Sequence, residues 1–305
     1  MKYIVLLLFS SIFVSCNKSE NVVNTTKNDL EKNSLKGKVN ILEEKNFDAA
    51  EKFGKPVKLN FRDWSVITYD PLGNILEEKT MYENGEIISI KKFKYDNKNK
   101  ILEENFVLGD NSDVAKYLYD VNDNNIELTY YRNGEIAIKH VNIFDSKHNL
   151  IDYRLYEYDG SLRFKILSKF NNKNLKIETE NYYLNGNSFT ISNKKTNKYD
   201  NKGNLIEEKS YDEKGNLNYT YKFVYDDKNN EIEKILSKDN IITKDKRNFD
   251  EFGNCIEGIE YSNDNFKSKF ANNYKYDKKG NWIQRIHLTN DVVKSIVERK
   301  IKYYN

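Results

Sequence analysis

The sequence predicts an all-β fold: a long antiparallel meander of β-hairpins, built from about nine repeats of about 25 residues. Three observations support this prediction. Of the 305 residues, 13% are aromatic, with 23 Tyr and 16 Phe, and these residue types favour strands. Only two prolines occur, so strands can pair along their whole length. An aromatic residue followed by Asp or Asn recurs every 24 to 29 residues along most of the chain.

The repeat begins with a turn motif, in which the recurring aromatic residue is numbered slot zero. Slot one is Asp or Asn, and slot four is Gly, Asn, Asp or His, the residue types that tolerate a left-handed backbone. This pattern predicts a type I turn closed by a bulge, with the slot-one side chain accepting hydrogen bonds from the turn's own N–H groups. We assign a structural turn role to these residues, most clearly to Asp70, Gly73, Asp200, Gly203, Asp250, Gly253, Asp277 and Gly280.

Two later slots differ consistently in character. Slot seven is Leu or Ile in every copy, and slot eight is Glu or Asp in all copies except the last, which has Gln284. Because adjacent strand residues point to opposite faces, the aliphatic row marks one face of the sheet and the acidic row the other. Lysines of the returning strand are expected to pair with the acidic row; they are Lys92, Lys116, Lys222 and Lys246.

Each repeat has a second turn near its middle. Its strongest markers are the Asn-Gly pairs typical of two-residue hairpin turns; they are Asn84-Gly85, Asn133-Gly134 and Asn185-Gly186. Two strands of about nine residues and two turns account for the repeat length. We expect the resulting meander to twist or coil into an open sheet.

The two ends of the array depart from the repeat. Residues 35–41 and 56–61 predict two strands before the first full copy, with a helical turn between them from Asp48 to Lys55. Residues 280–285 and 298–304 predict a terminal hairpin.

The N-terminus predicts export and lipid attachment. Lys2 precedes an apolar run from Tyr3 to Ser15, which is shorter than the ~20 residues that cross a bilayer. Residues 1–15 are therefore expected to form a secretory signal peptide. Phe13-Val14-Ser15-Cys16 resembles a lipobox, although Leu or Val is usual in place of Phe13, and it predicts acylation of Cys16 by palmitate-type chains.

The mature chain is expected to have two parts. Residues 16–34 are polar without periodicity and predict a flexible tether, and residues 35–305 form the repeat array. Asn17 gives no obvious inner-membrane retention signal, so we expect an outer-membrane lipoprotein facing either the periplasm or the exterior.

The slot pattern resembles the YD repeats of Rhs-type proteins, most closely in Tyr199-Asp-Asn-Lys-Gly-Asn-Leu-Ile-Glu-Glu208 and Tyr276-Asp-Lys-Lys-Gly-Asn-Trp282. The resemblance covers roughly residues 38–305, and the short lipobox-bearing format is similar to lipoproteins of Bacteroidota. It implies a coiled antiparallel meander, which in large relatives encloses a toxin. It implies no catalytic residues.

Residues that could carry chemistry have simpler structural explanations. Cys255 occupies slot six, where other copies have apolar side chains, so packing is favoured over a nucleophile. His140, His148 and His287 are far apart in sequence, which disfavours a metal site. The balance of 50 Lys+Arg against 47 Asp+Glu gives no basic footprint for nucleic acid. We expect no cofactor, metal or catalytic residue.

These observations favour a non-enzymatic envelope lipoprotein, attached to the membrane by its lipid anchor. It would act as a repeat scaffold or binding module for a glycan or a protein partner, using its aromatic faces. Trp64 and Trp282 lie near opposite ends of the array and do not form one obvious site. The alternatives are an immunity or accessory protein of a toxin system and, third, a glycoside hydrolase-like enzyme using carboxylates of the acidic row.

Overall fold

The computed structural model describes residues 28–186 and 188–305. One four-residue helix, α1 (Asp29–Lys32), precedes a sheet of 20 strands in this part of the chain. The expected signal peptide, Cys16 and the tether up to residue 27 lie outside the described residues. Within residues 28–186 and 188–305, no helix has the length and apolar composition that crossing a membrane requires.

The strands follow the repeat closely, two to each copy. They are β1 (Val39–Lys52), β2 (Lys55–Tyr69), β3 (Ile75–Met81), β4 (Ile87–Tyr95), β5 (Ile101–Leu108), β6 (Asn111–Tyr119), β7 (Asn125–Arg132), β8 (Glu135–Phe144), β9 (Leu150–Glu157), β10 (Leu162–Phe170), β11 (Lys176–Asn185), β12 (Ser188–Tyr199), β13 (Leu205–Tyr211), β14 (Leu217–Tyr225), β15 (Glu231–Lys238), β16 (Ile241–Phe249), β17 (Cys255–Ser262), β18 (Asn265–Tyr276), β19 (Trp282–Thr289) and β20 (Val292–Tyr303).

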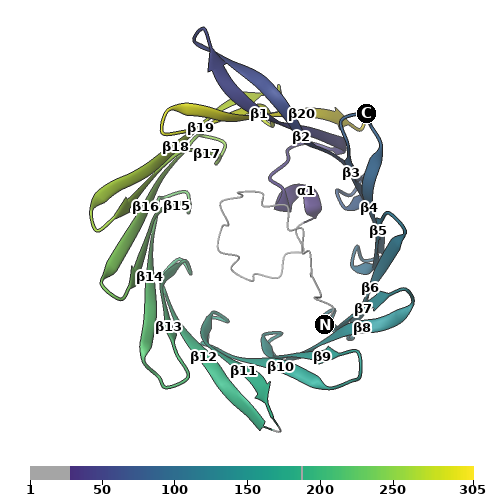
Figure 1. Ribbon diagram of the computed structural model, residues 1–305. Helices are drawn as coiled ribbons and strands as arrows, with labels where there is room; N and C mark the ends of the chain where they lie inside the picture. The colour runs from purple at the N-terminus through teal and green to yellow at the C-terminus, as the bar shows by residue number, and fades with distance from the viewer. Residues whose placement is uncertain (1–27, 187) are drawn as a thin grey trace.

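The sheet is closed, and the expectation of an open sheet is wrong. Each strand pairs antiparallel with the next, and β1 also pairs antiparallel with β20, from Val39 opposite Tyr303 to Asp48 opposite Ser295. An even number of strands makes the first and last run in opposite directions, so they can join in the same antiparallel pattern. Closure satisfies the two edges that an open meander would leave unpaired. Figure 1 shows the resulting ring, viewed along its axis.

The turns divide between the two ends of the ring. The YD turns, which follow the slot-zero residues, curl toward the axis, whereas the mid-repeat hairpins point outward (Figure 1).

The β1–β2 hairpin projects farthest from the ring (Figure 1). The helical turn expected from Asp48 to Lys55 is wrong, because pairing of β1 with β2 continues to Lys52 opposite Lys55. A two-residue turn of Phe53 and Gly54, both with positive φ, then closes the hairpin. The predicted terminal hairpin is confirmed as β19 and β20.

The main buried core lies at the seam, defined here as the inner side of β20, β1, β2 and β3. There α1 lies inside the ring (Figure 1). The core residues, all at most 9% exposed, are Leu30, Leu35, Val39, Leu42, Ile67, Tyr69 and Ile75. Part of the expected tether is therefore packed: Leu30 N donates to Gly73 O at 3.1 Å, and Asp29 Oδ2 accepts from Ile75 N at 2.9 Å.

Strand register separates an inner from an outer face. Tyr95 faces inward, because its hydroxyl donates to Asp29 of α1 at 3.1 Å, and alternation then places Phe93 on the same face. Lys92 and Lys94 face outward, and both are exposed. Phe93 is opposite Glu104 and Lys94 is opposite Glu103, so slot-eight acids lie outside and slot-nine residues inside.

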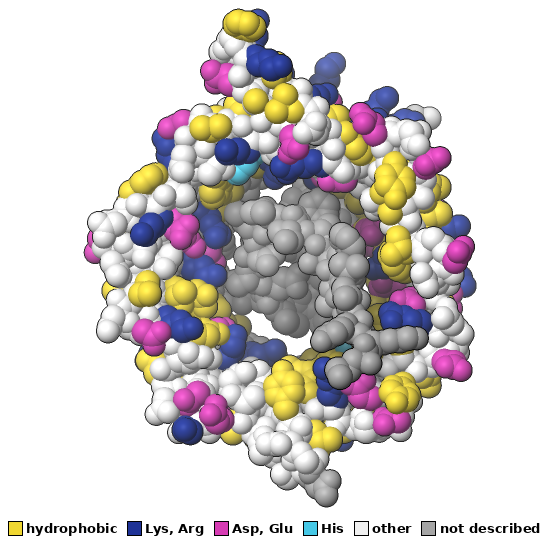
Figure 2. All heavy atoms as spheres, in the orientation of Figure 1, with side chains coloured by type: hydrophobic (Ala, Val, Ile, Leu, Met, Phe, Trp, Pro, Cys, Tyr) yellow, Lys and Arg dark blue, Asp and Glu magenta, His cyan; other side chains and the backbone are white. Residues whose placement is uncertain are grey.

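The outer face carries cross-strand ion pairs to slot eight, and of the four lysines expected to form them Lys92 and Lys246 do so, whereas Lys116 and Lys222 form none in the described part of the chain. Lys92 Nζ lies 3.7 Å from Glu77, and Lys246 Nζ lies 3.8 Å from Glu233. Shorter pairs join slot eight to the lysine just before slot zero, as in Lys94–Glu103 at 2.7 Å. In the space-filling view, basic and acidic side chains lie side by side over the ring (Figure 2).

The slot-seven aliphatic side chains remain 36–42% exposed in four copies, which are Leu76, Leu102, Ile177 and Ile206.

Candidate binding wall inside the ring

The YD turns contain the structural residues expected from the sequence. Asp70 Oδ1 accepts from the backbone N–H groups of Leu72 at 2.8 Å and Asn74 at 2.9 Å, and Gly73 has φ of 90°. The other turns share this arrangement of an accepting slot-one side chain and a left-handed slot four. Positive φ occurs at all nine slot-four residues, which are Gly73, Asn99, Asp123, His148, Asn174, Gly203, Asn229, Gly253 and Gly280.

Slot five carries a structural role that the sequence analysis missed. Three of its buried asparagines, Asn74, Asn149 and Asn204, donate both to the Asp of their own turn and to the slot-four side chain of the next turn. Asn204 Nδ2, for example, lies 3.0 Å from Asp200 Oδ2 and 3.1 Å from Asn229 Oδ1. Equivalent lateral bonds of 3.3 Å join Asn74 to Asn99 and Asn149 to Asn174. The signal was available, because seven of the nine copies have Asn at slot five.

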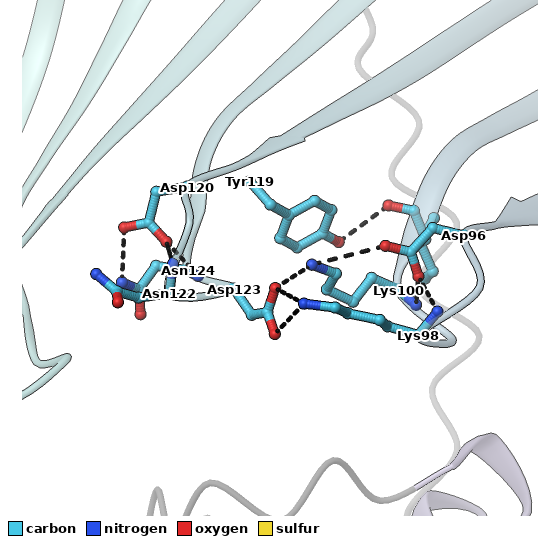
Figure 3. A network of polar contacts seen from close by, with 9 residues as sticks. Asp96, Lys98, Lys100, Tyr119, Asp120, Asn122, Asp123 and Asn124 are labelled. Carbon is cyan, nitrogen blue, oxygen red and sulfur yellow. Dashed lines mark hydrogen bonds and ion pairs between the residues drawn. The ribbon is translucent and has the colours of Figure 1, made fainter.

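One pair of turns replaces this amide contact with charge. Slot five of the second copy is Lys100, and the slot-four residue that faces it is Asp123; the two form an ion pair (Figure 3). Lys98 Nζ adds contacts of 3.1 and 3.2 Å to the same carboxylate. Where slot four has a side chain, it is therefore complementary to slot five of the preceding copy.

The slot-zero tyrosines connect successive repeats. The Tyr119 hydroxyl donates to Ile101 O at 2.9 Å (Figure 3), and the Tyr95 hydroxyl donates to Ile75 O at 2.7 Å. Tyr303 is a tenth slot-zero residue, missed because the chain ends soon after it, and its hydroxyl donates to Asp277. Burial and this contact with Asp277 raise the pKa of Tyr303 to about 12. The YD rim is thus occupied by structural contacts.

The inner face, by contrast, carries a continuous row of aromatic rings over β7 to β11. We call this row the ladder; its members are Tyr130, His140, Tyr153, Phe164 and Tyr183. Successive ring centroids are 5.4, 5.6, 5.6 and 5.2 Å apart. The two end residues remain accessible, since Tyr130 is 38% exposed and Tyr183 is 49% exposed. Aromatic faces of this kind can hold the C–H surface of a ligand ring.

A second aromatic group on the inner face contains basic and acidic neighbours. Tyr219, Tyr221 and Phe223 alternate along β14, with centroids 5.2 and 6.0 Å apart. Lys234 Nζ lies 4.4 Å from the centroid of Tyr221. The Tyr219 hydroxyl donates to Glu208 at 3.3 Å, and Lys195 pairs with the same carboxylate at 3.0 Å. Polar groups therefore lie beside the rings.

A third group lies on the inner side of β18 to β20. Trp282 and Tyr274 have ring centroids 5.9 Å apart. The guanidinium carbons of Arg299 and Arg285 lie 3.3 and 5.6 Å from the Trp282 centroid. Arg299 also pairs with Glu44 at 2.7 Å in a buried contact that joins β20 to β1. We use "inner wall" for these three aromatic groups together.

The acidic row considered for glycoside hydrolysis lies on the outer face, away from the inner wall. The slot-nine carboxylates Glu78, Glu104 and Glu208 face inward instead. Burial raises the pKa of Glu78, while Glu104 pairs with Lys91 at 2.5 Å. Sequence alternation from slot eight could have indicated these inward acids.

The histidines occupy three separate environments. The His140 Nδ1 atom lies 2.6 Å from the Tyr153 hydroxyl within the ladder, and His287 Nδ1 lies 2.9 Å from Asn272 Oδ1 on β18. Burial lowers the pKa of both imidazoles. His148 is on the YD rim, where Nδ1 lies 3.2 Å from Asn124 Oδ1. In the described ranges, no three His, Cys, Asp or Glu side chains are grouped to hold a metal ion.

Cys255 and the two tryptophans are also placed by the ring. Cys255 is 9% exposed, and its Sγ lies 3.4 Å from Glu257 O. Closure brings the strands of Trp64 and Trp282 to the same side of the ring, although they are far apart in sequence. They still form no common site, because Trp64 faces outward beneath Lys45, whose Nζ lies 3.7 Å from its ring centroid.

Comparison with known proteins gives limited matches. A protein-family model described as "Uncharacterised protein" matches residues 39–165. No curated protein matches the chain. A solved structure of TcdB2-TccC3-TEV is 10% identical with a TM-score of 0.39; the match covers 83% of this chain and 15% of that one. This chain therefore spans only a small part of that protein's length.

Two porin-like proteins from Bacteroides are similar over most of their length. The Bacteroides uniformis protein is 9% identical with a TM-score of 0.37, covering 87% of this chain and 96% of that one. The Bacteroides vulgatus protein is 11% identical with a TM-score of 0.25, covering 85% and 97%. All these TM-scores are below 0.5. Membership of the YD-repeat family stays a prediction.

Proposed function

We propose that this protein is a non-enzymatic cell-envelope lipoprotein whose inner wall binds a glycan. The observation that carries the proposal is the ladder: five aromatic rings on adjacent strands, with accessible rings at both ends. Sugars present apolar C–H faces and hydroxyl groups together. A wall that combines such rings with the carboxylate and ammonium groups beside Tyr219 and Tyr221 complements both features.

The lipobox-like N-terminus supports attachment to the envelope. In this proposal, acylated Cys16 is the first mature residue and holds the ring at the outer membrane. Incorporation of labelled palmitate should occur in the native chain and disappear in Cys16→Ala. Equal labelling of the two would eliminate the anchor.

Glycan binding can be tested at the ends of the ladder, where substitution disturbs packing least. A glycan array first identifies a ligand, and calorimetry then compares Tyr130→Ala and Tyr183→Ala with the native protein. We expect each variant to weaken binding by roughly tenfold, because loss of one stacked ring removes about 1 kcal/mol or more. Tyr158→Ala is the matched control, since Tyr158 is 74% exposed in the β9–β10 turn outside the ladder.

Two outcomes would redirect the proposal. A protein captured through the ladder, with no glycan bound, would favour a protein partner. Measured hydrolysis of a bound glycan would favour an enzyme, and Glu78→Gln and Glu104→Gln would then identify an indispensable inward carboxylate. A role as an immunity or accessory protein rests only on the family resemblance; a neighbouring toxin gene, with protection lost on deletion, would support it.

A further inference from the structure

Arg285 differs from every other arginine in the chain. All seven arginines lie in the described residues, and six form ion pairs: Arg62–Asp48, Arg132–Asp113, Arg154–Asp152, Arg163–Glu157, Arg247–Glu231 and Arg299–Glu44. Arg285 has no ion pair in the part of the chain that the structure describes. Its Nε atom is buried and makes no hydrogen bond there.

The position of Arg285 directs its side chain to the inner wall. On β19 it is opposite Tyr274 of β18 and Val297 of β20, and both face inward. Its guanidinium lies against the Tyr274 phenol, a neutral group. The residue itself is only partly buried, so a ligand in contact with this wall can reach the guanidinium.

The local charge balance is positive. Arg285 and Arg299 both lie near the Trp282 ring, but only Arg299 has a carboxylate partner, Glu44. The positive charge of Arg285 also contributes, after burial, to the lowered pKa of His287. A partly buried guanidinium without a counter-charge is costly. A ligand oxyanion would supply the missing counter-charge through charge-assisted hydrogen bonds, in addition to the hydrogen bond that the guanidinium makes to Tyr274.

We propose that Arg285 is an anion-recognition residue of the third aromatic group and that a glycan in contact with this part of the inner wall is acidic. An oxyanion of the sugar, either carboxylate or sulfate, accepts hydrogen bonds from the guanidinium while the sugar contacts Tyr274. This inference rests on the proposed glycan-binding function and specifies its ligand class.

The test compares three probes on the full-length protein: an oligogalacturonate, a sulfated dextran oligosaccharide and a neutral dextran oligosaccharide. We expect one acidic probe to bind at least about tenfold more tightly than the neutral one, and the preferred probe distinguishes carboxylate from sulfate. Arg285→Gln should remove this preference. Arg285→Lys should keep part of the preference for the acidic probe, because Lys retains the positive charge but lacks the planar guanidinium that donates two parallel hydrogen bonds.

Arg163→Gln is the matched control, since Arg163 is an exposed arginine on the outer face and should not affect binding. If circular dichroism shows that Arg285→Gln does not fold, the binding of the three probes is measured on Arg285→Lys instead. Unchanged selectivity of Arg285→Lys for the acidic probe would then overturn the inference. Binding of neutral glycans with no acidic preference would overturn this inference alone. Failure of all three probes, with no glycan ligand on the array, would overturn the proposed function as well.

Discussion

The side-chain amide of Asn204 joins two consecutive YD turns by donating to Asn229 Oδ1 at 3.1 Å, one repeat farther along the chain. The same nitrogen donates to Asp200 of its own turn at 3.0 Å, so a single buried amide closes one turn and positions the next. Neighbouring hairpins are thus connected by side chains at the YD rim as well as by backbone pairing between strands.

Replacing Asn204 tests this lateral connection. We expect Asn204→Ala to lower the free energy of unfolding by about 1–2 kcal/mol, because it removes two hydrogen bonds donated by a buried amide. Urea denaturation followed by circular dichroism measures the change. Asn216→Ala is the control: Asn216 makes the same bonds to Asp212 of its own turn but is exposed. Equal losses in the two variants would show that the contact between turns contributes nothing.

Gly253 tests the left-handed requirement of slot four. Its φ is 85°, and no other atom lies within 4 Å of the position that a Cβ would take, so a substitution there changes backbone strain alone. Gly253→Ala should destabilise the ring by about 1–2 kcal/mol. Gly253→Asn should cost less, since Asn229 holds φ of 60° at the equivalent slot. Thermal melts of the two variants should differ in that order, and the reverse order would contradict the assigned role.

The Arg299–Glu44 pair tests the closure of the ring. Both side chains are nearly buried, at 8% and 11% exposure, and they connect β20 to β1. Glu44→Ala leaves a buried guanidinium without its partner, which we expect to cost about 3–5 kcal/mol in urea denaturation. Glu157→Ala removes the partner of exposed Arg163 and should cost at most about 1 kcal/mol. Similar losses in both would argue against a buried seam contact.

His140 predicts a pH dependence of stability. Burial lowers the pKa of its imidazole below the ordinary 6.5, so the unfolded chain takes up a proton first as pH falls. The free energy of unfolding should therefore decrease as pH falls below about 6.5. Comparing urea midpoints at pH 8 and pH 5.5 measures this effect. His140→Gln should reduce the difference, leaving the part due to His287. An unchanged pH dependence in His140→Gln would contradict the prediction.

Local features of the repeat could be predicted because each depends on a few neighbouring residues. Asp at slot one and a residue with a left-handed backbone at slot four form a turn whose contacts all lie within one copy of the repeat. Alternation likewise separates slot eight from slot nine. The lateral role of slot five was missed because its amide also acts between copies about 25 residues apart, and a single turn shows only the bond to its own Asp. The aromatic content was visible, but the ladder requires the register of five strands.

The sequence by itself determined the strand content, the turn chemistry and the outer row of paired charges, since these follow from period-two alternation and local backbone preference. Only the tertiary structure decided that the meander closes, which ends pair, and which face lines the interior. Those outcomes depend on contacts such as Val39 opposite Tyr303, near the two ends of the array, and on α1 covering the seam. Ring closure also places Arg285 on an inner wall near the buried Arg299–Glu44 pair, a relationship that spacing along the chain does not express.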